Sequence, residues 1–156
     1  MRLAFMAQDA PHLQYAANKC CKHMSLPTKG GLHRLKRVAR FLRGRHRCIQ
    51  EFPMQHKKDG GRLDVYCDSD WAADKVDRKS VSCVAIPHGA HLIKFTVSTQ
   101  GIIALSSGEA EFIASVKASS TSLGTRSLAA DLGLTATPRL RMDSTAALGI
   151  YGRRGI

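Results

Sequence analysis

Apolar and polar positions in the second half of the chain recur with the period of β-strands. Residues 63–67 alternate between the two types, so that Asp68, at the end of this run, shares a face with the polar positions. Two β-branched runs, 81–86 and 92–97, flank the turn sequence PHGAH. This part of the chain therefore predicts one strand followed by a hairpin.

The period changes to that of a helix after a brief extended piece at 102–105. Residues 107–119 predict a helix whose start, the S-x-x-E sequence from Ser106 to Glu109, fits a capping box, and residues 121–131 continue the helical pattern. A further strand is expected at 139–142, and Ser144 begins another helix. Strand, hairpin, helix, strand and helix in this order predict an α/β fold with a mixed sheet and covering helices.

The first third of the chain has only helical patterns. Residues 9–24 predict one helix with Asp9 as its cap, and residues 25–31 (SLPTKGG) predict a break. Residues 32–43 predict a second helix that ends at Gly44, with an apolar stripe on one side and arginines largely outside it. We therefore expect a basic helical segment over residues 1–50, a linker over 51–62, and an α/β domain over 63–156.

The charge of the chain, +12 over 156 residues, is concentrated in this first segment. Residues 1–50 hold eleven Lys and Arg and one acid, whereas the remaining residues hold thirteen and eleven. A concentrated basic region favours a polyanionic partner, with nucleic acid ahead of an anionic membrane surface. The alternatives are a solvated basic face and a helix pair that packs on another protein assembly. The residues expected to contact nucleic acid are Arg34, Arg37, Arg40 and Arg43.

The cysteines and the hydropathy of the chain indicate the kind of compartment in which the protein folds. The five cysteines are odd in number and form no C-x-x-C pair, which favours reduced thiols in the cytosol or nucleus. No run reaches the ~18 apolar residues of a membrane span.

Carboxylates occur at three places along the chain where the sequence indicates a functional site. Asp68 and Asp70 follow the first strand in VYCDSDWAADKVDRKS, Glu109 and Glu111 lie in LSSGEAEFIA, and Asp143 lies in LRMDSTAAL. Acids at the ends of strands are costly unless they are paired or bind a cation. These segments therefore raise the question of metal-dependent chemistry.

In order and spacing, these three segments resemble the ribonuclease H domain of copia-type retrotransposon polyproteins. The corresponding stretches there are roughly Y-S-D-A-D-W-A-G-D…D-R-K-S-T-S-G, A-L-S-S-T-E-A-E-Y and C-D-N-x-S-A, and the resemblance covers about residues 61–150. Residues 1–50 resemble the end of the preceding reverse transcriptase, with its S-x-P-T…L-K-R-V-x-R-Y-L-x-G pattern. Two departures are Cys83 for a usual glycine and Gly108 for a usual threonine.

The resemblance implies a ribonuclease H module, a hydrolase that cleaves the RNA strand of RNA–DNA hybrids with two Mg²⁺ ions held by converging acids. It implies Asp68, Glu111 and Asp143 as catalytic and metal-binding residues. Within each motif, Asp68 ends the apolar run, and Glu111 begins the family's pattern of an acid, two apolar residues and alanine. Glu109 has another explanation, because a glutamate suits the first turn of a helix. Asp143 alone has one too, since it could cap the next helix.

The family pattern also has a fourth carboxylate, in an H-x-D-x-R-Y-H segment that is missing from this sequence. The resemblance then implies a ribonuclease-H-like sheet that lacks its last strand and helix. Two functions stay open. One is an active ribonuclease H module beside a reverse transcriptase, and the other is a truncated, non-catalytic remnant that binds nucleic acid or serves as a structural subunit.

Overall fold

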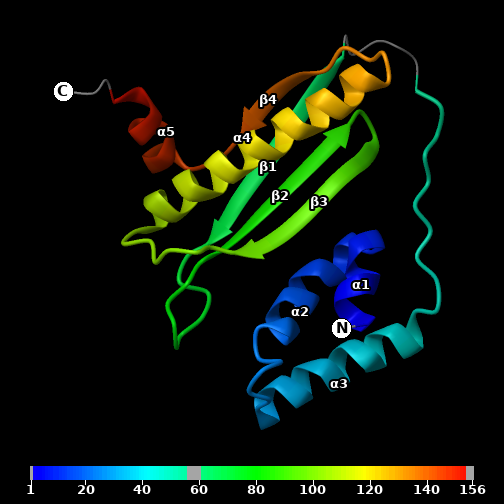
Figure 1. The fold of residues 1–156 in the computed structure, drawn as a ribbon, viewed down its shortest axis with the longest axis vertical. Helices are drawn as coiled ribbons and strands as arrows, with labels where there is room; N and C mark the ends of the chain where they lie inside the picture. The colour runs from blue at the N-terminus through cyan, green and yellow to red at the C-terminus, as the bar shows by residue number, and fades with distance from the viewer. Residues whose placement is uncertain (1, 56–60, 154–156) are drawn as a thin grey trace. The chain divides into compact units, whose positions relative to one another are not determined.

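The chain forms two compact units, which we describe separately. The computed structural model describes residues 2–55 and 61–153, and it divides the chain into Met1–Glu51 and Phe52–Ile156 (Figure 1). The boundary falls at the start of the segment 51–62 that we expected to be a linker. Residues 56–60 of that segment lie outside the described residues.

Within residues 2–51, the first unit contains three helices where the sequence predicted two. These are α1 (Arg2–Asp9), α2 (Pro11–Cys21) and α3 (Lys29–Gly44). Ala10 separates the first two with a non-helical backbone (φ −127°, ψ 85°), because the residue before a proline is disfavoured in the helical conformation. Asp9 therefore ends α1 and does not cap α2, so that part of the prediction was wrong.

Helix α3 begins three residues earlier than predicted, and only part of its apolar stripe packs on the other two helices. The Thr28 hydroxyl accepts a hydrogen bond from the Gly31 N–H at 3.0 Å, which caps the helix inside the predicted break. Val38 and Leu42 pack against the buried cluster of α1 and α2, whose members are Ala7, Leu13 and Ala17. The other large positions of the predicted stripe, Leu32 and Leu35, are exposed. Only the carboxyl-terminal part of the stripe thus contacts the core.

The second unit is built on a four-stranded mixed sheet, as predicted. Its strands are β1 (Arg62–Asp70), β2 (Val81–His88), β3 (His91–Thr99) and β4 (Thr137–Arg141), and they lie in the order β3-β2-β1-β4. The first three are antiparallel neighbours, whereas β4 runs parallel to β1, with Val65 opposite Leu140. Residues 102–105, where we expected a brief extended piece, join no strand.

In the described part of this unit, one helix covers a face of the sheet and a second helix packs on the first. Helix α4 (Ser107–Asp131) is one continuous helix that crosses β1, β2 and β4, and α5 (Thr145–Gly152) packs on α4 (Figure 1). The core between α4 and the sheet includes Leu63, Val65, Val84, Ile86 and Ala118. An α/β fold with a mixed sheet and covering helices is therefore confirmed, and it is consistent with a ribonuclease-H-like fold.

Gly108 explains how closely the two helices approach. A Cβ atom at this position would lie 2.8 Å from the Cβ of Ala146, so a larger residue would push α5 away from the start of α4. The departure from the family's threonine at this position is thus coupled to the packing of α5.

The segment that ends at Gln55 is tied to the hairpin turn. The Gln55 side-chain amide donates to the carbonyl of His88 at 3.1 Å, and its oxygen accepts from the N–H of Ala90 at 3.0 Å. Gln55 is also 2.7 Å from Nδ1 of His91. This glutamine stabilises the end of the sheet opposite to the carboxyl end of β1.

Candidate metal centre

Two of the predicted acids meet because β1 and β4 are parallel neighbours. Asp68 lies near the carboxyl end of β1, and Asp143 follows β4 by two residues. The carboxyl ends of parallel strands lie at the same edge of a sheet, so both aspartates project at that edge, where both are exposed.

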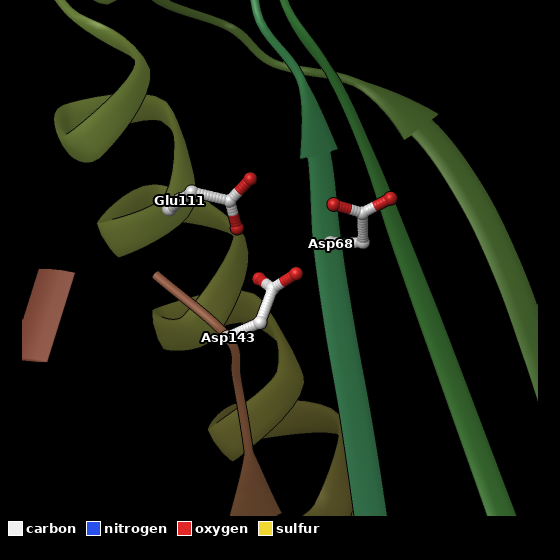
Figure 2. Close-up of side chains that lie close together, drawn as sticks. All are labelled: Asp68, Glu111 and Asp143. Atoms are coloured by element: carbon white, nitrogen blue, oxygen red, sulfur yellow. The ribbon is translucent and has the colours of Figure 1, made fainter. Parts of the chain in front are cut away.

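Glu111 reaches the same place from the second turn of α4. It is only 9% exposed, because its turn of the helix faces the sheet. One carboxylate oxygen from each of Asp68, Glu111 and Asp143 lies within 4.8 Å of the other two. Figure 2 shows the three side chains converging from a strand, a helix and the loop after β4. Their role as ligands stays a prediction.

The acids with alternative explanations take different positions. The Glu109 carboxylate accepts a hydrogen bond from the Leu105 N–H at 2.7 Å, and the Glu109 N–H donates to the Ser106 hydroxyl. Glu109 therefore takes part in capping α4, with its carboxylate bound to the residue before the N-cap Ser106. Ser144, and not Asp143, caps α5, since its hydroxyl accepts from the Ala147 N–H. The group of three carboxylates within 4.8 Å contains neither Asp70 nor Glu109.

The environment of Glu111 favours its protonated form. Burial raises the pKa of its carboxyl group, and the negative charge of Asp68 raises it further. The Ser69 N–H opposes this shift by donating to Oε1 of Glu111 at 3.1 Å. The other oxygen, Oε2, is buried and accepts no hydrogen bond from an N–H group of the described residues, whereas protonation of Glu111 would let its carboxyl group donate to Asp68. A buried oxygen without a partner is costly, and a bound cation would satisfy it.

These donors fit Mg²⁺. All three groups are hard oxygen ligands, and carboxylates from separate elements leave space for water and substrate oxygens around the ion. The two aspartates also line a hollow on the open face of the sheet, together with Tyr66, Cys67, Cys83, Ala85, Arg141 and Met142. Burial and the Asp68 charge raise the pKa of the Cys83 thiol, so this departure from the family places a neutral thiol in the hollow.

Other groups near the acids were not identified from the sequence. The Trp71 indole N–H donates to the Ala104 carbonyl at 3.0 Å, which ties the loop after β1 to the segment before α4. Ser69 and Gln100 contact the acid-bearing elements through hydrogen bonds. A backbone N–H has no signature in the sequence. The polar Gln100, after a β-branched run, was a signal that sequence inspection missed.

The predicted nucleic-acid contacts lie in the first unit. All four side chains project from α3 and are exposed, and they are Arg34, Arg37, Arg40 and Arg43. They stand outside the positions that contact the α1–α2 cluster.

Comparisons with known proteins point to retrotransposon polyproteins. The chain is 32% identical, over 149 residues, to the retrovirus-related Pol polyprotein from transposon RE1 of Arabidopsis thaliana, an alignment that covers 93% of the chain. It is 32% identical, over 133 residues, to the corresponding polyprotein from transposon RE2 of the same plant, with 85% of the chain covered. An uncharacterised mitochondrial protein of Arabidopsis thaliana is 30% identical over 110 residues, or 70% of the chain.

The chain spans 10% and 9% of the two transposon polyproteins and 45% of the mitochondrial protein. No family model matches the sequence. No solved structure matches it either. The homologues support an origin in a retrotransposon polyprotein, in agreement with the copia-type resemblance of the motifs. Of the helices in the described part of the chain, none has the length and apolarity that crossing a bilayer requires.

Proposed function

We propose that the second unit is a retroelement-derived ribonuclease H module that hydrolyses the RNA strand of RNA–DNA hybrids. The observation that carries the proposal is the convergence of Asp68, Glu111 and Asp143 within 4.8 Å, from three separate elements. The homology to retrovirus-related Pol polyproteins supports it, because such an origin agrees with the three ordered motifs.

Two Mg²⁺ ions bound to these acids would activate a water molecule and stabilise the leaving oxygen of the cleaved phosphodiester. The protein's own groups supply the arrangement. Asp68 and Asp143 face the open hollow from which a nucleic-acid strand would approach. Glu111 closes the opposite side, where its burial excludes water and the Ser69 N–H holds one of its oxygens.

The test is cleavage of an RNA–DNA hybrid with a labelled RNA strand by the full chain in Mg²⁺. Asp68→Asn removes one charge from the cluster, so cleavage is expected to fall by at least about 100-fold. Asp70→Asn is the matched control, since Asp70 lies two residues later on the same strand and outside the cluster. Cleavage that survives Asp68→Asn would refute the proposed site. Metal and hybrid binding without any cleavage would favour the non-catalytic alternative.

For the first unit we propose binding to nucleic acid through α3. The exposure of all four arginines supports this, since their charges are not used inside the unit's core. Affinity governed by phosphate contacts falls with salt by a logarithmic slope of about 0.9 for each phosphate neutralised on duplex DNA. Binding that does not change with salt, or binding to a protein only, would instead indicate the structural-subunit role.

A further inference from the structure

Gln100 occupies an unusual place for an amide side chain. It follows β3 directly, is 5% exposed, and anchors its backbone by donating its N–H to the Ser80 carbonyl at 2.8 Å. Its side chain therefore lies inside the unit, between the sheet and the first turns of α4. A buried amide is costly unless its hydrogen-bonding groups are satisfied.

The side-chain amide of Gln100 joins two elements of the fold. Its nitrogen donates to the Ser82 hydroxyl on β2 at 2.9 Å and to the Ala110 carbonyl on α4 at 2.9 Å. A third contact, to the Ser69 hydroxyl on β1, is longer at 3.4 Å. Gln100 thus connects the strands to one turn of the helix.

Two of these three contacts, those to Ala110 and Ser69, lead to Glu111. Ala110 precedes Glu111 on α4, and the Ser69 N–H is shared between Oε1 of Glu111 at 3.1 Å and Oδ1 of Asp68 at 2.8 Å. Any shift of this turn relative to β1 would change the distance between Ser69 and Glu111. It would also move Glu111 relative to Asp68, which precedes Ser69 on the strand.

The amide is not arranged for stability alone. Its oxygen, Oε1, is buried and accepts no hydrogen bond from the described residues, which costs free energy that an apolar side chain would avoid. Local arrangements that are costly in this way concentrate at functional sites.

We propose that Gln100 is a positioning residue for the metal centre. This inference rests on the proposed function. Gln100 holds the turn of α4 that carries Glu111 at the distance from β1 at which the three carboxylates share a cation. It acts through Ala110 and Ser69 and contacts neither metal nor substrate. Groups that orient metal ligands typically contribute 10–100-fold to metal affinity, although they never touch the ion.

The test compares Gln100→Met with Gln55→Met in the full chain. Both changes remove a glutamine with hydrogen bonds at 3.1 Å or shorter, but Gln55 stabilises the hairpin turn at the far end of the sheet. The first readout is Mn²⁺ affinity, measured by electron paramagnetic resonance. The second is hydrogen exchange of the Ser69 amide relative to the core amide of Val65, which separates local loosening from general destabilisation.

Gln100→Met is expected to weaken Mn²⁺ binding by about tenfold and to accelerate hydrogen exchange of Ser69 relative to Val65. Gln55→Met is expected to change neither the Mn²⁺ affinity nor this relative exchange rate. Gln100→Asn, which is too short to span Ser82 and Ala110, gives the same result in a milder form if the methionine variant does not fold. Unchanged Ser69 exchange in a folded Gln100 variant would overturn the proposal, and so would an equal effect of Gln55→Met.

The two readouts also separate this inference from the proposed function. If the unmodified chain binds no Mn²⁺, the metal centre fails, and the Ser69 exchange ratio alone decides whether Gln100 positions Glu111. If Mn²⁺ binds equally well to the chain and to both Gln100 variants, the metal centre stands and the role of Gln100 is refuted.

Discussion

Replacing Glu111 by glutamine is expected to stabilise the metal-free protein. The three carboxylates lie within 4.8 Å of one another, and two unit charges at that distance repel by roughly 3.5 kcal/mol at an effective dielectric constant of about 20. Asp68 and Asp143 are exposed to water, which reduces the repulsion on Glu111 to about 1–2 kcal/mol. The amide would keep an oxygen for the Ser69 N–H and add a donor toward the aspartates.

The stability gain should depend on pH in a defined direction. The pKa of Glu111 is raised above its ordinary value of 4.5, so the folded state binds this proton more tightly than the unfolded state does. Its stabilising contribution is complete below pH 4.5 and is lost as the pH rises through the folded-state pKa. The advantage of the glutamine variant should therefore grow from acidic to neutral pH.

Thermal unfolding with and without Mg²⁺ measures both effects. A change of 1 kcal/mol shifts the midpoint by about 4–8 °C in a domain of this size, so Glu111→Gln should unfold about 4–16 °C higher at pH 7 without metal. Mg²⁺ at about 100 times its Kd should stabilise the unmodified chain by about 2.7 kcal/mol, and the variant by much less.

Glu109→Gln is the matched control, because Glu109 lies on the same helix but caps it. It should lose roughly 0.5–1 kcal/mol at the helix start and keep its response to Mg²⁺. The reasoning is refuted if Glu111→Gln lowers the unfolding midpoint at neutral pH, or if Mg²⁺ raises the midpoints of the chain and of this variant equally.

Three further outcomes are expected. Gly108→Thr should lower the free energy of unfolding, measured by chemical denaturation, by about 1–3 kcal/mol, because its Cβ would meet that of Ala146. Gly124→Ala is the control, since no neighbouring element lies within 4 Å of its added Cβ, and it should raise that free energy by roughly 0.5–1 kcal/mol. Burial and the charge of Glu111 raise the pKa of the Cys67 thiol to about 11. At pH 8, iodoacetamide should therefore label the exposed Cys48 well before Cys67, as measured by peptide mass spectrometry. Equal labelling rates would contradict the burial of Cys67. Titrations of a DNA duplex at several salt concentrations should give a shallower salt dependence, with the fold intact by circular dichroism, when four residues are changed to glutamine: Arg34, Arg37, Arg40 and Arg43.

Local patterns predicted most of the second unit. The alternation in residues 63–67 determines which side chains face α4, because a strand's period of two leaves no other choice once one face is buried. The cap at the start of α4 was also predictable, since it depends on Ser106 and Glu109, which lie only three positions apart in the sequence. In the first unit, helix α1 was not predicted, and the start of α2 was placed at Asp9 although the structure starts it at Pro11.

The sequence by itself determined the identity of the candidate ligands, because chemistry and motif order depend on residue type. Only the tertiary structure decided that Asp68, Glu111 and Asp143 lie within reach of one ion, since this requires β4 to pair in parallel with β1 and α4 to cross both. The contacts of Ser69 and Gln100 were also beyond local patterns. They join residues between 10 and 42 positions apart, and such pairs meet only after the sheet and helix have packed.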